Sequence, residues 1–328
     1  MKNQKIVLEP KTQAFVDALA AQGGKPLYEL SYADARKVLE DAQASASVTK
    51  LPADVEDKIF PVGPTGQTSV RIYRPKGAKG TLPVVMYYHG GGWVLGSKNT
   101  HDRLLRDLVN GTNAAFVFVN YTPSPEAQFP IPIEQGFAAL KYVAEHGDEL
   151  DLDTTRLAIA GDSVGGNMAA VVALLAKERK GPTIRYQVLF YPVTDGSMSQ
   201  NSYKEFADGP WLTAAASKYF FDAYVPNRAD RKTTMVSPLA ATTEQLKGLP
   251  PALVIVDEND ILRDEGEEYA RKLLQAGVKT TIIRVLGTIH DFVMLNALAD
   301  TAATKAAIDL ASQELAQILD SAARRPAA

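Results

Sequence analysis

The spacing of hydrophobic and polar residues divides the chain into segments of different local structure. Upstream of residue 55, apolar positions recur at helical spacing and predict two amphipathic helices, over residues 12–21 and 32–44. Beyond that point apolar and polar residues alternate, which predicts strands at 57–61 and 69–74. The N-terminal segment is therefore expected to be helical and to precede the first strand.

Long apolar runs follow, and such runs are typical of strands buried on both faces of a parallel sheet. The predicted buried strands are residues 84–88, 114–119, 157–160 and 186–191. Helical patterns stand between these runs at residues 102–110, 133–145 and 165–180. Because strand and helix alternate in this way in wound folds, we expect an α/β protein.

Residues 196–240 interrupt the alternation with a polar stretch followed by clustered aromatic side chains, and we predict a partly helical cap inserted there. The alternation then resumes with strands at 252–257 and 280–286 and helices at 266–276 and 300–319. The expected organisation is an N-terminal helical cap segment (1–54), a first part of the core (55–195), the cap insertion (196–240) and a second part of the core (241–328).

Composition narrows the possible functions. The formal net charge is −3 with acids and bases interspersed, and no basic stripe suited to phosphates occurs, so nucleic acid is not expected as a partner. The absence of cysteine excludes disulfides, thiolate catalysis and cysteine-ligated metals. The start of the chain lacks a secretory signal pattern, and no apolar run reaches the roughly 18 to 20 residues that cross a bilayer. We therefore expect a cytoplasmic protein that does not enter a membrane.

A glycine-flanked serine lies between the predicted strand 157–160 and the predicted helix 165–180. The segment Gly161-Asp162-Ser163-Val164-Gly165 matches the G-x-S-x-G nucleophile elbow. A sharp turn between strand and helix brings the residues two positions from the serine into close contact, so both need to be glycine or very small. The alternative is a glycine-rich turn with a solvated serine, which the flanking strand and helix argue against. We predict that Ser163 is a nucleophile.

A second glycine motif, His89-Gly90-Gly91-Gly92-Trp93, directly follows the predicted strand 84–88. Consecutive glycines cost backbone entropy and occur where a backbone needs to approach another group closely. We expect the N–H groups of Gly91 and Gly92, with that of Val164, to bind an oxyanion, at about 3 to 4 kcal/mol per donor. A flexible turn is the alternative, but the order of the two motifs favours the oxyanion loop.

The general base is expected to be His290, one of four histidines in the chain. It follows the predicted strand 280–286 across a short loop, which would project it over the carboxyl edge of the sheet. The order serine, acid, histidine along the chain also supports this prediction. Its acid partner is expected in the loop after strand 252–257, which offers Asp257, Glu258, Asp260, Asp264 and Glu265. Asp264 and Glu265 also suit the N-terminus of the following helix. Asp260 is chosen for its spacing beyond the strand end together with the family resemblance given below, and Asp257 is the main competitor.

With these motifs in place, the sequence resembles the bacterial hormone-sensitive lipase family of α/β-hydrolase carboxylesterases over residues 55–320. The motifs that carry the resemblance are His89-Gly90-Gly91-Gly92-Trp93, Gly161-Asp162-Ser163-Val164-Gly165-Gly166-Asn167, Asp260-Ile261-Leu262-Arg263-Asp264-Glu265-Gly266 and His290-Asp291-Phe292. The resemblance implies an α/β-hydrolase fold with an eight-stranded, mostly parallel sheet flanked by helices and a helical cap. It also implies a triad of Ser163, Asp260 and His290, and hydrolysis of short-acyl esters without a cofactor or metal, often as a homodimer.

The sequence departs from the pattern of that family at three places. Val164 stands where the family usually has alanine, and Asp291 stands where glycine is common. The family's Tyr-Arg-Leu-Ala-Pro-Glu box appears here as Tyr121-Thr122-Pro123-Ser124-Pro125-Glu126, without the arginine, and Asn120 replaces the preceding aspartate. We expect these changes to alter the support of the site and its substrate preference, with Val164 shortening the acyl pocket.

The substrate-binding residues are expected to come from both motifs and from the cap insertion. They are Trp93, Asp162, Phe206, Trp211 and Tyr219. For the aromatic members the alternative is that they pack the cap against the core, the commoner role of buried aromatic side chains.

The predicted function is that of a serine carboxylesterase acting on a small-molecule ester through an acyl-enzyme intermediate. A non-catalytic ligand-binding protein on the same fold is one alternative, which the presence of His290 disfavours. An amidase, a lactonase or a carbamate hydrolase with the same triad is another. A dinucleotide-binding oxidoreductase is disfavoured because no G-x-G-x-x-G run follows the first strand of a βαβ unit.

Overall fold

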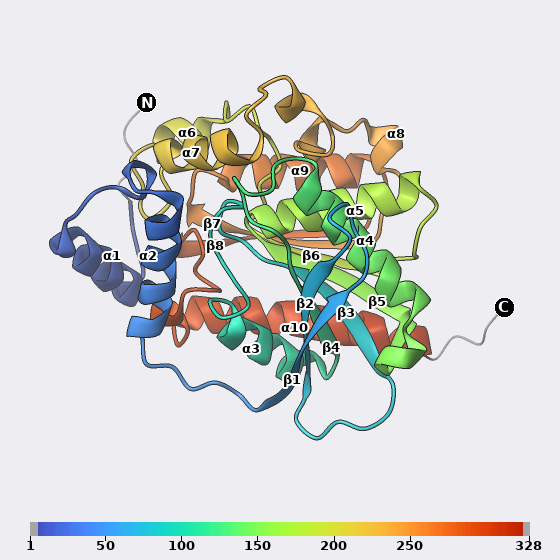
Figure 1. Cartoon of the computed structure of the whole chain (residues 1–328). Helices are drawn as coiled ribbons and strands as arrows, with labels where there is room; N and C mark the ends of the chain where they lie inside the picture. The colour runs from blue at the N-terminus through green and yellow to red at the C-terminus, as the bar shows by residue number, and fades with distance from the viewer. Residues whose placement is uncertain (1–5, 324–328) are drawn as a thin grey trace.

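The computed structural model describes residues 6–323 and contains one sheet in the strand order β1-β2-β4-β3-β5-β6-β7-β8 (Figure 1). The strands are β1 (Ala53–Phe60), β2 (Thr68–Pro75), β3 (Leu82–Tyr88), β4 (Ala115–Asn120), β5 (Leu152–Asp162), β6 (Gln187–Phe190), β7 (Ala252–Asn259) and β8 (Thr280–Ile289). β2 pairs antiparallel with β1 and with β4, and all the other pairs are parallel. The predicted eight-stranded, mostly parallel sheet is therefore confirmed.

Helices surround this sheet. They are α1 (Pro10–Gln22), α2 (Tyr32–Ser45), α3 (Asp102–Thr112), α4 (Ile131–Glu145), α5 (Val164–Glu178), α6 (Asn201–Glu205), α7 (Ala214–Tyr224), α8 (Thr243–Leu246), α9 (Arg263–Gln275) and α10 (Ala302–Ala323). Short 3-10 turns are η1 (Leu27–Glu29), η2 (Asp148–Leu150), η3 (Asp230–Lys232), η4 (Pro238–Ala240) and η5 (Asn296–Leu298). No helix within residues 6–323 has the length and apolar character needed to cross a membrane.

The core has two layers because side chains alternate between the two faces of each strand. On β3, Val84, Met86 and Tyr88 pack in a cluster that includes residues of α4, α5 and α9, whereas Val85 and Tyr87 pack in a cluster with α3 and α10. Figure 1 shows these two groups of helices on opposite faces of the sheet. Burial on both faces explains why the sequence of β3 is continuously apolar.

The segments predicted as cap lie beside one another although they are far apart in the sequence (Figure 1). The ring centroids of Phe15 in α1 and Trp211 in the insertion are 5.5 Å apart, and those of Tyr32 in α2 and Tyr219 in α7 are 5.1 Å apart. Aromatic pairs at such separations contribute packing energy beyond the area they bury. The N-terminal helices and the insertion thus form one packed group.

Some predicted boundaries were wrong. β8 continues to Ile289 instead of ending at residue 286, because Ile289 pairs with Asn259 of β7 after a shift in register. β5 begins at Leu152 rather than at residue 157. The extension of β8 means that His290 directly follows a strand rather than a loop. The predicted segments 1–54 and 241–328 each include a few terminal residues that lie outside the described part of the chain.

Candidate active site

Ser163 occupies a sharp turn between β5 and α5. Its φ of 56° and ψ of −121° lie where side-chain-bearing residues are rarely found, which indicates local strain. A Cβ added to Gly165 would lie 2.0 Å from the carbonyl oxygen of Tyr88, and one added to Gly161 would lie 2.2 Å from the carbonyl oxygen of Gly165. The turn therefore requires glycine at both positions, as the sequence pattern predicts.

Ser163, Asp260 and His290 meet at the carboxyl edge of the sheet. They directly follow β5, β7 and β8, and parallel strands bring their carboxyl ends to the same edge. His290 Nε2 lies 2.8 Å from Ser163 Oγ, and His290 Nδ1 lies 2.7 Å from Asp260 Oδ2. All three residues are buried. These are the distances over which a histidine can take a proton from a serine while an aspartate orients its ring.

Asp257, the competing acid, lies farther away. Its Oδ2 is 4.0 Å from His290 Nδ1, and neither of its carboxyl oxygens has a hydrogen-bond partner within the described residues. Burial, and then the neighbouring carboxylate of Asp260, raise the pKa of Asp257 well above its usual range. This shift favours the uncharged form of Asp257, and Asp260 is the residue in contact with the histidine.

Asp257, Asp260 and His290 are also close enough together to be considered as metal ligands, since their ligand atoms lie within 4.8 Å of one another. However, both ring nitrogens of His290 already have hydrogen-bond partners in Asp260 and Ser163. A histidine that binds a metal needs one ring nitrogen for it. The observed arrangement fits proton transfer better than metal binding.

The glycine loop after β3 approaches the nucleophile closely. A Cβ on Gly90 would lie 3.1 Å from Ser163 Cβ, and Gly91 and Gly92 have φ values of 105° and 65°. No group within residues 6–323 accepts a hydrogen bond from the N–H of Gly91, Gly92 or Val164. Buried N–H groups are rarely left without a partner, so unpaired ones beside a nucleophile are well suited to bind a developing oxyanion.

An apolar cavity of about 190 Å³ opens above these groups. The residues that line it are Ser163, His290, Val164, Gly91, Gly92 and apolar side chains of α2 and α7. Trp93 and Trp211, two of the residues expected to bind substrate, also line it. Residues of the N-terminal helices and of the insertion therefore contribute one wall of the cavity, and the loops that carry Ser163, His290 and the glycines contribute the other.

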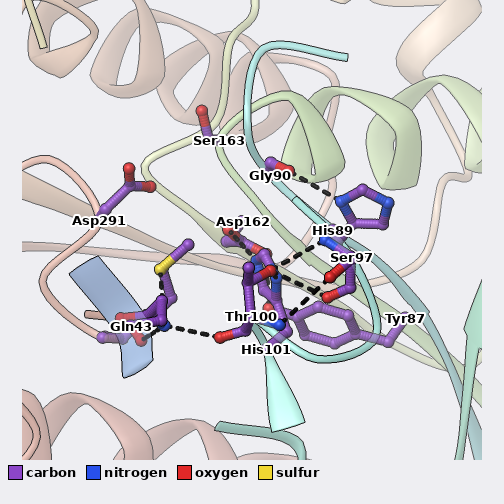
Figure 2. A network of polar contacts seen from close by, with 12 residues as sticks. Gln43, Tyr87, His89, Gly90, Ser97, Thr100, His101, Asp162, Ser163 and Asp291 are labelled. Atoms are coloured by element: carbon purple, nitrogen blue, oxygen red, sulfur yellow. Dashed lines mark hydrogen bonds and ion pairs between the residues drawn. The ribbon is translucent and has the colours of Figure 1, made fainter. Parts of the chain in front are cut away.

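The structure places the other three expected substrate-binding residues outside this cavity. Phe206 is buried in the core with the Arg263 guanidinium over its ring. Tyr219 packs on Tyr32 and so joins α7 to α2. For Phe206 and Tyr219, the contacts fit the alternative of a packing role. Asp162 points away from the cavity into a polar network below the nucleophile (Figure 2).

Asp291 lines the cavity next to the histidine. Its φ is 67°, a backbone conformation that favours glycine. Its Oδ2 accepts a hydrogen bond from Trp211 Nε1 at 2.9 Å, and its Oδ1 lies 3.5 Å from His290 Nε2 without a hydrogen bond. Asp291 thus puts a carboxyl group beside His290 and ties the loop after β8 to the insertion.

The proline-rich box at residues 121–126, which lacks an arginine of its own, is contacted by an arginine from another segment. Arg36 of α2 makes two hydrogen bonds to the carboxylate of Glu126, at 2.8 and 2.6 Å, and others to the carbonyl oxygens of Ser124 and Val94. Helix α2 therefore supports the box and the end of the glycine loop. The expectation that support around the site differs from that in the family stays a prediction.

The protonation of His290 depends on several carboxyl groups around it. Burial alone would lower the pKa of His290, but Asp260, Asp291 and then Asp162 raise it to about 9. A carboxylate that raises this pKa stabilises the imidazolium formed when the histidine takes the serine proton. The same effect favours the protonated form of His290 in the resting state.

His101 is a polar residue that the sequence analysis did not assign to the site. It caps the start of α3, is fully buried, and places Nε2 3.2 Å from Asp162 Oδ2. The sequence carries little signal for this contact, because a histidine beside a predicted helix resembles any surface histidine. Only the packing of α3 against the sheet brings it beneath the nucleophile.

Comparison with known proteins shows that this chain is similar to hydrolases. The family described as having the alpha/beta hydrolase fold matches residues 85–294 of the chain. The chain is 42% identical over 235 residues to the carboxylesterase NlhH of Mycobacterium tuberculosis, covering 71% of this chain and 74% of that protein. It is 32% identical over 303 residues to an ethyl acetate hydrolase of Pseudomonas putida, covering 90% of this chain and 95% of that protein.

A solved structure extends the comparison to three dimensions. The thermostable esterase of Pseudomonas putida ECU1011 superposes with a TM-score of 0.94 at 51% sequence identity, covering 96% of this chain and 99% of that one. The fold and these similarities define an enzyme of the hydrolase class. The chain belongs to the α/β-hydrolase family, and the predicted fold is confirmed.

Proposed function

We propose that this chain is a serine carboxylesterase of the bacterial hormone-sensitive lipase family, acting on short-acyl esters through an acyl-enzyme. The observation that carries the proposal is the series of contacts from Asp260 through His290 to Ser163, below an apolar cavity faced by unpaired N–H groups. The carboxylesterases among its relatives support the same activity.

In the proposed mechanism, Ser163 Oγ attacks the ester carbonyl carbon while His290 Nε2 takes its proton. The N–H groups of Gly91, Gly92 and Val164 stabilise the tetrahedral oxyanion, and the protonated histidine passes its proton to the leaving alcohol. A water molecule activated by His290 then hydrolyses the acyl-enzyme, and the acid leaves. Asp260 orients the ring throughout and stabilises its positive charge.

Labelling with a fluorophosphonate probe followed by peptide mapping tests the assignment of the nucleophile. We expect the probe to attach to Ser163, because only an activated serine reacts at an appreciable rate. Matched ester, amide and lactone substrates with one acyl group then separate the proposed esterase from an amidase or a lactonase. Preferential turnover of the amide or lactone would reject the substrate class proposed here.

The acyl-chain preference is expected to depend on Val164, whose side chain lines the cavity beside the nucleophile. Val164→Ala removes two methyl groups and should raise kcat/KM for p-nitrophenyl octanoate relative to the acetate by about tenfold. The backbone N–H of the oxyanion site is retained in this variant. The measurement compares acetate, butyrate and octanoate esters in both proteins, and an unchanged chain-length profile would reject the idea.

The pH profile is expected to have its acid limb well above the ordinary histidine range. His290 acts as a base only when unprotonated, and its pKa is raised to about 9. We therefore expect kcat/KM for p-nitrophenyl acetate to fall about tenfold per pH unit below that value and to level off above it. Asp291→Asn should move the midpoint to lower pH, since Asp291 is one of the carboxylates that raise the pKa of His290. A wild-type midpoint near the ordinary histidine value would contradict this prediction.

The division into cap and core is part of the proposal. α1, α2 and residues 196–240 would form a cap that covers the cavity, and the remainder would form the catalytic core. The homodimer implied by the family resemblance stays a prediction, which sedimentation velocity would check.

A further inference from the structure

A second buried acid–imidazole pair lies directly beneath the nucleophile. Asp162 precedes Ser163 at the end of β5 and is completely buried. Its Oδ1 accepts a hydrogen bond from the Tyr87 hydroxyl at 2.7 Å, and its Oδ2 lies 3.2 Å from His101 Nε2. Figure 2 shows these groups on the side of the turn opposite to the Ser163 side chain. None of them lines the cavity.

These contacts keep the buried carboxylate charged. Burial would raise the pKa of Asp162, but the imidazole of His101 and the hydroxyl of Tyr87 lower it below its usual value. An unpaired buried carboxylate is strongly unfavourable, so these two partners help to keep the charge at this position. Because a carboxylate only accepts hydrogen bonds, the proton of His101 that faces it resides on Nε2.

The carboxylate packs against the oxyanion loop as well as the nucleophile turn. A Cβ on Gly90 would lie 2.3 Å from Asp162 Oδ2, so the loop backbone rests on this carboxylate. On the far side of the loop, His89 Nδ1 lies 2.8 Å from the carbonyl oxygen of Gly90. Asp162 is therefore enclosed between the turn that carries Ser163 and the loop that carries the oxyanion donors.

The pair is also connected to the histidine loop through the N-terminal cap segment (Figure 2). His101 Nδ1 lies 2.9 Å from Thr100 Oγ1, and Gln43 Nε2 of α2 donates to the carbonyl oxygens of Thr100, at 2.6 Å, and Met294, at 2.9 Å. Met294 follows His290 in the same loop. One buried amide thus joins the segment that holds His101 to the segment that holds the catalytic histidine.

We propose that Asp162 and His101 act as positioning residues that hold the nucleophile turn and the oxyanion loop in register for catalysis. This inference rests on the proposed esterase function. Neither residue contacts substrate, so their loss should reduce turnover more than substrate binding. A displacement of about 1 Å in a catalytic group can cost up to about 100-fold in rate.

The pair has an electrostatic consequence that a purely structural role would lack. The groups that face His290 are Ser163, the Tyr191 ring and the carboxyl groups of Asp257, Asp260 and Asp291. The charge of Asp162 acts on His290 from beneath the turn and raises its pKa. Removing the charge of Asp162 while keeping its shape should lower the pKa of His290. The acid limb of the pH profile should then move to lower pH.

Tyr87→Phe and Tyr88→Phe form a matched pair of test variants on β3. Both hydroxyls are buried and hydrogen-bonded, but that of Tyr87 binds Asp162 whereas that of Tyr88 binds the carbonyl oxygen of Gly136. With p-nitrophenyl acetate well below the melting temperature, we expect Tyr87→Phe to lower kcat about tenfold with KM little changed. Tyr88→Phe should leave kcat within about twofold. Equal effects of the two variants on kcat would overturn the proposal.

Asp162→Asn provides the second measurement, because asparagine keeps the acceptor for Tyr87 and removes the charge. We expect kcat to fall by about 10- to 100-fold, KM to change little, and the midpoint of the pH profile to move down. An unchanged kcat, or an unmoved midpoint, would overturn the inference. If Asp162→Asn does not fold, the tyrosine pair decides alone.

Wild-type controls distinguish failure of the positioning role from failure of the proposed function. If wild-type protein neither hydrolyses the ester nor reacts with the fluorophosphonate at Ser163, the proposed function and the inference fall together. If wild-type protein does both and the variants behave as Tyr88→Phe does, only the positioning role is rejected.

Discussion

Ser163→Ala is expected to lower kcat for p-nitrophenyl acetate by about 10,000-fold or more while leaving the protein folded. The variant loses the atom that attacks the ester carbonyl and keeps the glycine loop and the cavity. The side chain of Ser163 makes no capping hydrogen bond to α5, so its removal does not weaken the start of that helix. The lost hydrogen bond to His290 is worth about 1 kcal/mol.

Steady-state kinetics and thermal unfolding followed by circular dichroism measure these two effects separately. Ser217→Ala is a matched control for labelling, because Ser217 lines the same cavity and its hydroxyl faces Tyr203 instead of the catalytic histidine. The fluorophosphonate should label the Ser217→Ala variant and fail to label Ser163→Ala. Full activity of Ser163→Ala would end the proposed mechanism.

Asp260→Asn is expected to reduce kcat by about 10,000-fold, and Asp257→Asn by only a few-fold. Asparagine at position 260 would present an amide to His290 and favour the wrong tautomer of the ring. Burial and the neighbouring Asp260 raise the pKa of Asp257 and so favour its uncharged form, which asparagine resembles in shape and charge.

The two variants control for each other, since both alter a buried carboxyl group close to His290. Kinetics for both, with thermal unfolding to correct for any loss of folded protein, settle which carboxylate acts as the acid. A larger loss in Asp257→Asn than in Asp260→Asn would reverse the assignment made here.

The conformation of Ser163 argues against the alternative of a non-catalytic binding protein on this fold. Such a protein would not need Ser163 in a strained conformation with its hydroxyl 2.8 Å from an imidazole. Strain of this kind costs free energy and persists where the surrounding structure enforces it for a function. The site geometry and the esterase relatives therefore favour catalysis.

Several features could be predicted from the sequence because they depend on local contacts or on the order of motifs. The glycines around Ser163 are required by atoms only a few residues away or on the adjacent strand. The buried strands could be found because a strand covered on both faces has to be apolar at every position. The order of Ser163, the acidic loop and His290 indicated which side chains would meet.

Other features were decided only by the tertiary structure. Asp257 and Asp260 belong to the same acidic stretch, and the end of β7 determines which of them reaches His290. Whether an aromatic side chain such as Trp211 or Phe206 lines the cavity depends on how the cap packs on the core. These contacts join segments far apart in the chain, so no local pattern specifies them. For the same physical reason no local pattern indicates the contact between His101 and Asp162, which are 61 residues apart. The packing of α3 against the sheet brings them together.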